Sequence, residues 1–263
     1  MLLTLSAGAY RGRLDSEKDP LTLFDLPEFT ITELGLRGLG INASQLAGFG
    51  MAELEQVRDC ADKASCPVLL LNEDTPLDFG SPDPNVQDTI LERIRRLGLA
   101  TTALGASSLG VACGGTDNDE TFDQAAATIR RAMQAIDRHE VNLLLRPTPG
   151  LTEAPERLTE LIKKVGGFRI GSLPDFRDAH LGGDFVPALR RLAPYAGAVY
   201  ATLGGRKKSD PTPYSLEEGL EAVLAVGYQN TICLHYEGTG DPTESIIAAR
   251  DQFHSSLEDD EEE

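Results

Sequence analysis

Polar and ionisable side chains lie at the ends of four short apolar runs in the second half of the chain. The runs read VNLLLR, FRIGSLPD, AVYATL and TICLHYE, and the residues concerned are Arg146, Asp175, Tyr200, Thr202, His235 and Glu237. A carboxylate or an imidazole can remove a proton from a carbon next to a carbonyl group. A guanidinium can stabilise the resulting oxyanion, or bind a phosphate or carboxylate. We therefore take Asp175, His235 and Glu237 as candidate catalytic residues, and Arg146, Tyr200 and Thr202 as candidate substrate-binding residues.

These residues also have structural interpretations. His235 can be a pocket-facing group, a core histidine satisfied by a neighbour such as Asp175 or Tyr200, or a metal ligand. Arg146 and Asp175 can instead form a buried ion pair. Asp178 and His180 follow Asp175 in an expected loop, from which one of them can reach the pocket, although a histidine in a surface loop is more often simply solvated.

The elements that position these residues alternate along the chain. Short apolar runs predict strands at 2–7, 38–42, 67–72, 101–106 extended by 110–112, 141–146, 168–175, 198–203 and 231–237. Amphipathic stretches predict helices at 51–63, 85–97, 122–138, 154–165, 184–192, 216–226 and 242–253, with only a short or poor helix after the first strand. Eight such units predict parallel strands and a single α/β domain, a (β/α)8 TIM barrel. A doubly wound sheet is the alternative, but no GxGxxG turn or phosphate loop is present.

In a barrel, successive side chains alternate between the interior and the helix layer. The apolar residues Ile232, Leu234 and Tyr236 should face the helices, which turns Cys233, His235 and Glu237 inward. The same rule turns inward Asn142, Leu144 and Arg146, then Arg169, Gly171, Leu173 and Asp175, and then Tyr200 and Thr202. Because barrel active sites lie at the carboxyl ends of the strands, the four polar ends should meet at one rim.

The composition limits the partners. The chain has 263 residues with a formal net charge of -18, which argues against general nucleic-acid binding. Its four cysteines are scattered and form no CxxC pair, so we expect free thiols. We expect neither a signal peptide nor a membrane span, and hence a cytoplasmic protein. Residues 1–256 are expected to form the barrel and residues 257–263, ending in DDEEE, a disordered acidic tail.

The chain resembles the xylose isomerase-like sugar phosphate isomerase/epimerase family of TIM barrels. LLLRPTPGLTEAPERLTELIKKVGGFRIGSLPDF is similar to its fifth strand, helix and sixth strand. GYQNTICLHYEGTGDPTESIIAARDQF is similar to its eighth strand and last helix, and GLRGLGIN to its second strand. The resemblance spans the whole chain.

The resemblance implies a divalent metal held by a Glu, an Asp, a His and a Glu at the ends of strands five to eight. This chain has Arg146, Asp175, Tyr200 and His235 at those positions, so Asp175 is the one ligand kept. A guanidinium cannot deprotonate to coordinate, and its charge repels a cation. The resemblance therefore implies a degenerate metal site and no cofactor. A displaced Mn or Mg site on Asp175, His235 and Glu237 stays open as an alternative.

Two functions follow. The first is an isomerase or epimerase acting on, or binding, a small sugar, polyol or sugar acid at the barrel mouth by proton transfer next to a carbonyl. The second is a non-catalytic barrel that binds a ligand or a partner after loss of the metal ligands. The oligomeric state is left open by the sequence.

Overall fold

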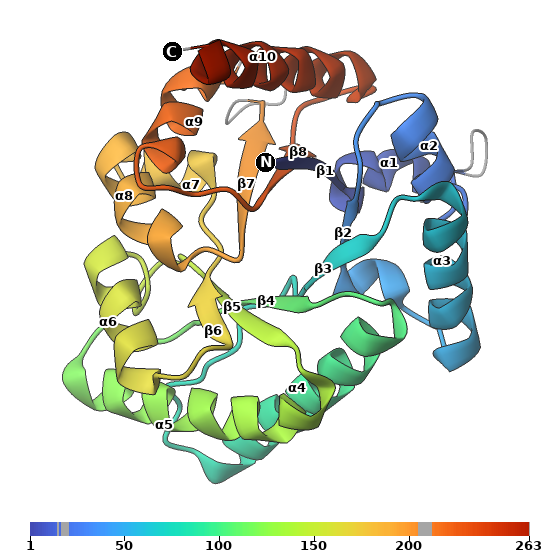
Figure 1. Ribbon diagram of the computed structural model, residues 1–263. Helices are drawn as coiled ribbons and strands as arrows, with labels where there is room; N and C mark the ends of the chain where they lie inside the picture. The colour runs from blue at the N-terminus through green and yellow to red at the C-terminus, as the bar shows by residue number, and fades with distance from the viewer. Residues whose placement is uncertain (15, 17–20, 205–211, 263) are drawn as a thin grey trace.

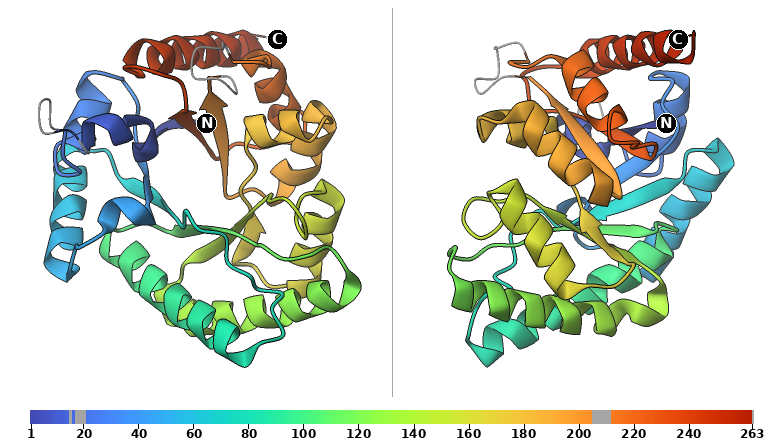
Figure 2. Two further views of the ribbon diagram at one scale, coloured as in Figure 1. Left: turned by 180° about the vertical axis from the view of Figure 1, so that it is seen from behind. Right: turned by 60° about the vertical axis from the view of Figure 1, so that its left-hand side comes forward.

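The computed structural model is a barrel of eight parallel strands surrounded by helices, as Figures 1 and 2 show. It describes residues 1–14, 16, 21–204 and 212–262, and side chains up to residue 257. The strands are β1 (Leu2–Ser6), β2 (Leu39–Asn42), β3 (Val68–Asn72), β4 (Ser108–Ala112), β5 (Asn142–Arg146), β6 (Ile170–Ser172), β7 (Ala198–Leu203) and β8 (Thr231–Tyr236). The hydrogen-bonded order is β6-β5-β4-β3-β2-β1-β8-β7. Bridges from Ser172 to Ala196 and from Asp175 to Tyr200 close the ring between β6 and β7. The predicted (β/α)8 barrel is confirmed.

The helices follow the strands in the expected alternation. They are α1 (Arg11–Leu14), α2 (Leu26–Thr32), α3 (Met51–Ala64), α4 (Pro84–Ala103), α5 (Asp119–Ile136), α6 (Pro155–Val165), α7 (Phe176–Leu181), α8 (Phe185–Leu192), α9 (Leu216–Leu224) and α10 (Thr243–Glu262). Short 3-10 turns lie at Ala7–Tyr10, Ala43–Leu46, Asp137–His139 and Ala193–Tyr195. Helix α10 thus includes residues that the sequence analysis assigns to the acidic tail; the side chains of residues 258–263 lie outside the described part.

The prediction of a strand at 101–106 is wrong, because α4 continues to Ala103. Ile94, Leu97 and Thr101 are buried at helical spacing, so the apolar pattern is that of a helix face. The Thr101 hydroxyl donates to the Leu97 carbonyl one turn back, so this buried hydroxyl has its hydrogen-bond partner within the helix. Gly105, with φ +76, then makes the turn into β4, which starts at Ser108.

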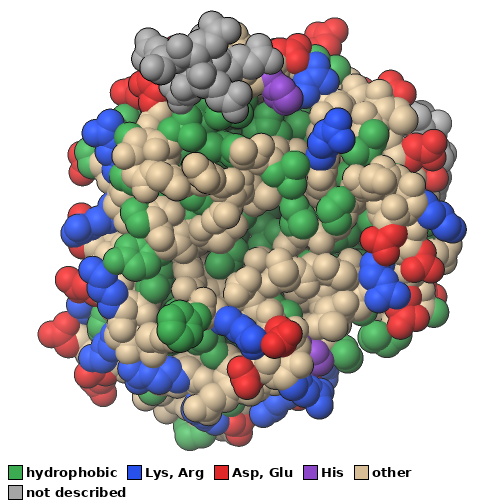
Figure 3. Space-filling view, in the orientation of Figure 1, with side chains coloured by type: hydrophobic (Ala, Val, Ile, Leu, Met, Phe, Trp, Pro, Cys, Tyr) green, Lys and Arg blue, Asp and Glu red, His purple; other side chains and the backbone are tan. Residues whose placement is uncertain are grey.

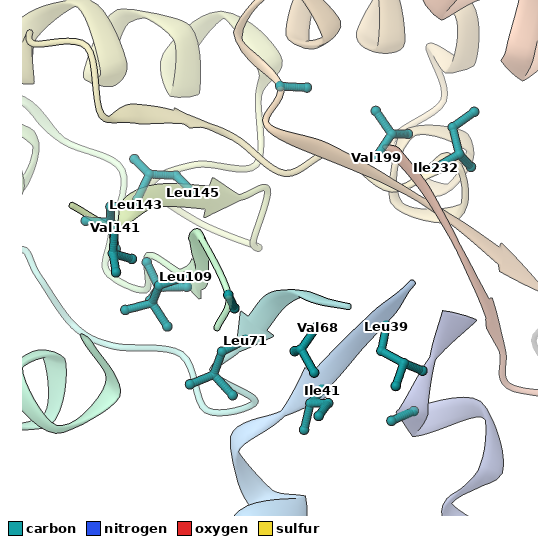
Figure 4. Packing of buried hydrophobic residues seen from close by; sticks show 14 of the residues in the cluster. Leu39, Ile41, Val68, Leu71, Leu109, Val141, Leu143, Leu145, Val199 and Ile232 are labelled. Atoms are coloured by element: carbon teal, nitrogen blue, oxygen red, sulfur yellow. The ribbon is translucent and has the colours of Figure 1, made fainter. Parts of the chain in front are cut away.

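The predicted alternation of strand side chains is confirmed over most of the barrel. Leu143, Leu145, Val199 and Ile232 belong to the large core between barrel and helices, and Figure 4 shows them pointing away from the barrel interior. A separate inner cluster contains the residues predicted to face inward, Leu144, Leu173, Tyr200 and Cys233, together with Leu70 and Ala198.

The amino end of β6 departs from the predicted alternation. Arg169 precedes the strand and pairs with Asp137 and Glu140 on the outside, so the inward placement predicted for it is wrong. Phe168 is fully exposed.

The inner cluster depends on a glycine in β4. A Cβ at Gly110 would lie 2.6 Å from Leu173 Cδ2 and 2.8 Å from Asn72 Oδ1, closer than real Cβ contacts. The absence of a side chain there lets Leu173 fill the barrel.

On the face shown in Figure 3, charged side chains gather around the periphery, and the centre of the face is mostly uncharged.

Candidate active site at the barrel mouth

Four predicted site residues meet at the carboxyl ends of β5 to β8. Arg146 is the last residue of β5, and Asp175 follows β6 as the N-cap of α7. Thr202 on β7 is paired in register with His235 on β8, and Asp175 lies beside β7 through its bridge to Tyr200. The sequence-based expectation that these strand ends converge is therefore correct.

Asp175 is held in place by its neighbours. It is 7% exposed, and its Oδ2 accepts a hydrogen bond from the Thr202 hydroxyl at 2.5 Å. Its Oδ1 accepts from the Arg177 backbone N–H at 3.0 Å, which caps the first turn of α7. Burial raises the pKa of Asp175, while Thr202, Arg146 and the capped N–H oppose that rise. With both oxygens occupied, Asp175 is best suited to fixing the start of α7.

The cap brings a second carboxylate, Asp178, to the mouth. Asp178 lies in the first turn of α7, and its Oδ2 is 3.8 Å from Arg146 Nη2. Burial, reinforced by the nearby Asp175 carboxylate, raises the pKa of Asp178 to about 6, against the effect of Arg146. Both side chains are about one-third exposed, so they are open to a ligand. The plugging ion pair considered for Arg146 and Asp175 is thus replaced, among the described contacts, by one between Arg146 and Asp178.

Arg146 has unused hydrogen-bonding capacity. A guanidinium carries five N–H donors in a planar fork. Within the described part of the chain, its guanidinium donates no hydrogen bond and has the single ion pair with Asp178 at 3.8 Å. Such a group at the rim suits a carboxylate, a phosphate or a developing oxyanion.

Glu237 and His235 form a second charged group on the β8 side. Arg177 donates to Glu237 Oε2, and His235 Nε2 lies 3.7 Å from Glu237 Oε1. Interaction with the His235 ring lowers the pKa of Glu237 to about 2; Arg177 adds to this and partial burial opposes it. Glu237 is therefore an ionised neighbour of His235 and is a weak base at neutral pH.

Tyr200 and Thr202 are more deeply buried than Arg146 and Asp178. Tyr200 belongs to the inner cluster, and its hydroxyl would be 3.4 Å from a Cβ placed at Gly40 on β2. It therefore packs below the rim, with its ring edge-on to His235 at 6.3 Å between centroids. The Thr202 hydroxyl is used by Asp175. These two residues support the site from beneath.

Buried polar atoms below the rim complete the site. The Tyr200 hydroxyl, His235 Nδ1 and Asn72 Oδ1 are buried and make no hydrogen bond to another described residue. Asn72 ends β3 and lies 3.5 Å from Asn42 of β2 through its amide nitrogen. Polar groups of this kind point to a mouth that binds a polar ligand.

The sequence analysis missed Arg177 and left Asp178 undecided between site and solvent. The signal for Asp178 was its spacing, because positions three residues apart share one face of a helical turn. The sequence analysis placed Asp175 at the end of a strand and Asp178 in the following loop, whereas Asp175 is the N-cap of α7 and Asp178 lies in its first turn. His180 lies on the other side of α7, against Phe185 and Tyr214, and does not join the site.

The residues at the expected metal positions do not fit a divalent cation. Among the described residues, no group of three or more His, Cys, Asp or Glu side chains can hold a metal ion. Both oxygens of the Asp175 carboxylate already accept hydrogen bonds, from Thr202 and from the α7 cap, and Arg146 brings a fixed positive charge to the same rim. The displaced site on Asp175, His235 and Glu237 is not assembled either, because Glu237 is bound to Arg177.

Comparison with solved structures gives the same fold. An L-ribulose 3-epimerase superimposes with a TM-score of 0.82 at 14% identity, covering 98% of this chain and 94% of that one. A D-psicose 3-epimerase from Clostridium cellulolyticum H10 gives 0.76 at 15% identity, covering 95% and 90%. A 3-keto-D-glucoside 4-epimerase from E. coli gives 0.77 at 16% identity, covering 97% and 99%. At these identities the likeness shows the fold alone.

A search of curated proteins finds no match. No helix in the described residues is both long enough and apolar enough to cross a membrane. Residues 30–255 match the family described as Xylose isomerase-like TIM barrel, which is most of the chain. The chain belongs to the xylose isomerase-like TIM barrel family.

Proposed function

We propose that this protein is an isomerase or epimerase of a small sugar or sugar acid, and that it works at the barrel mouth without a metal ion. The observation that carries the proposal is the Asp178 carboxyl group, with a pKa raised to about 6, lying 3.8 Å from the guanidinium of Arg146. A base whose pKa lies near the working pH is suited to proton transfer. A cation beside it is suited to the oxyanion that the transfer creates. The epimerases among the similar folds support the reaction class.

Each residue has a role in this reaction. Ionised Asp178 removes the proton from the carbon next to the carbonyl group. The electron pair of that C–H bond forms a C=C bond, and the carbonyl π pair moves to oxygen, where Arg146 stabilises the negative charge. For isomerisation, the oxyanion takes up a proton, the hydroxyl on the deprotonated carbon gives up its proton and becomes the new carbonyl, and the former carbonyl carbon receives the returned proton. For epimerisation, the carbonyl re-forms and the proton returns to the opposite face of the same carbon.

His235, from the β8 side of the mouth, is the group we assign to proton return on the opposite face. Glu237 lies 3.7 Å from its ring, and Arg177 donates a hydrogen bond to Glu237. Asp175 and Thr202 fix the start of α7 and hence the position of Asp178. The candidate catalytic residue Asp175 is thus proposed to act by positioning.

A non-catalytic sugar-binding barrel is the second candidate. It is favoured because Arg146, Tyr200 and His235 stand at three positions where the family resemblance implies other metal ligands. In either case we propose the cytoplasm as the compartment, which fits the four free cysteines. A small-molecule ligand is proposed as the partner in both cases.

Deuterium exchange tests the proposal. Protein treated with a chelator is incubated in D2O with ketoses, ketose phosphates and hexuronates, and proton NMR follows the carbon next to each carbonyl. We expect deuterium incorporation from at least one compound, reduced by at least ~100-fold in Asp178→Asn. Asp62→Asn, at an exposed site on α3, is the control and should match wild type. Binding without exchange would establish the non-catalytic candidate, and exchange that survives Asp178→Asn would remove Asp178 as the base.

A further inference from the structure

A cavity of about 470 Å³ opens beside the mouth, between the loop after β5 and helices α7 and α8. Its volume lies in the range of pockets that hold small organic ligands, roughly 300–1,000 Å³. Asp175 and Asp178 contribute to its wall, so it shares the base and its positioning residue with the mouth. A ligand whose reacting carbon lies at Asp178 therefore has room to extend sideways, away from the barrel axis.

The lining determines which chemistry fits. The apolar part of the wall consists of Pro147, Ala154, Pro155, Pro174, Ala179, Ala188 and Leu192. Proline rings and small side chains offer flat apolar surface suited to a ring. No Lys or Arg lines the cavity in the described part of the chain, whereas several carboxylates do. Asp117 and Glu156 are paired with Arg157 and Arg191, which lie outside the lining.

The carboxylates of the lining exclude an anionic part of the ligand from the cavity. A second phosphate or carboxylate on the ligand would be repelled there by like charge. The charges at the mouth and in the cavity thus differ. The mouth offers the free donors of Arg146 to an anion, and the cavity offers apolar walls with acceptor oxygens. A ligand that satisfies both has an anionic sugar part and an uncharged part.

We propose that the cavity is a subsite for an uncharged, ring-bearing substituent, and that the substrate class is a glycoside or aryl-substituted derivative of a sugar acid. This inference rests on the proposed function in its epimerase form, because the carboxylate is the one carbonyl group that such a glycoside keeps: it assumes that this carboxylate lies at Arg146 and the carbon next to it at Asp178. In this proposal, the loop after β5 and helices α7 and α8 select substituted sugars over free sugars.

Calorimetry with matched probes tests the subsite. The probes are glucuronate and galacturonate and their phenyl glycosides, titrated into protein treated with a chelator. Wild type should bind each phenyl glycoside at least tenfold more tightly than the free acid. Ala154→Trp should bring this ratio close to one and leave the affinity for the free acid unchanged. Ala154 lines the cavity at the exposed, extended N-cap of α6, where its side chain makes no capping bond, so the larger ring does not enter the core.

Two further variants keep the result interpretable. Ala179→Leu narrows the part of the wall that α7 contributes and should act in the same direction. Ala52→Trp, exposed on α3 and away from the cavity, is the matched control and should retain the full ratio.

The outcomes separate this inference from the function on which it rests. If free acids bind but the phenyl group adds nothing, or if Ala154→Trp keeps the ratio, the subsite is refuted and the mouth assignment stands. If no free acid or glycoside binds, the sugar-acid assignment falls and the subsite falls with it.

Discussion

The contact between Thr202 and Asp175 should contribute measurably to stability, and Thr202→Val tests it. The substitution removes a hydroxyl and keeps the shape of the side chain. Thr202 is 1% exposed and Asp175 7%, so water cannot easily replace the lost donor. A buried hydrogen bond to a charged group contributes ~1.5–3 kcal/mol. At ~2–4 °C per kcal/mol for a domain near this size, the melting temperature should fall by ~3–12 °C.

The assay is urea denaturation followed by circular dichroism, repeated across pH. Thr159→Val is the matched control: its hydroxyl is also buried but donates to the neutral carbonyl of Glu156, so its loss should cost ~1 kcal/mol or less. Thr202 lowers the pKa of Asp175, which means that its hydrogen bond favours the ionised form. The deficit of Thr202→Val should therefore shrink as pH falls and Asp175 becomes protonated. Equal effects for the two variants, or a deficit independent of pH, would refute the reasoning.

Two further predictions concern the barrel interior and the β8 side of the mouth. Gly110→Ala should destabilise the protein by ~1–3 kcal/mol in urea denaturation, because the new Cβ meets Leu173 and Asn72 at 2.6 and 2.8 Å. Gly12→Ala, whose Cβ would meet nothing within 4 Å, should stay within ~0.5 kcal/mol of wild type, and equal losses would contradict this packing. The pKa of Glu237 is lowered to about 2, so its stabilising effect is complete above its unfolded pKa and is lost as pH falls toward 2. In Glu237→Gln the melting temperature should fall less steeply as pH is lowered. An unchanged pH dependence would show that the interaction of Glu237 with His235 and Arg177 has no energetic effect.

Strand periodicity predicted the barrel interior well, because side chains on a strand alternate strictly. Leu144, Leu173 and Cys233 lie in the inner cluster as that rule requires. The same rule brought Arg146 and His235 to the rim. It failed at Arg169, which precedes β6 and turns to the outside.

The failures share a physical cause, which is that local patterns do not specify tertiary partners. The run at 101–106 contains Thr and Leu in an order that suits a strand or the end of a helix, and packing of α4 decided between them. The role of Asp178 depends on where α7 begins, and Asp175 fixes that point only once Thr202 is beside it. The side cavity is formed where the loop after β5, the start of α6 and helices α7 and α8 pack together, so no single stretch could reveal it.

The exchange of a metal site for an anion site built on Arg146 is the central claim, and one titration tests it most directly. Glucuronate and galacturonate are titrated by calorimetry into wild type and Arg146→Met, each with a chelator and then with excess Mn²⁺. We predict that at least one of the acids binds wild type with the same affinity in both conditions, and that Arg146→Met loses at least tenfold in each, since the guanidinium has unused donors at the rim formed by the described residues. Binding that requires Mn²⁺, or that is unchanged in Arg146→Met, would contradict the account.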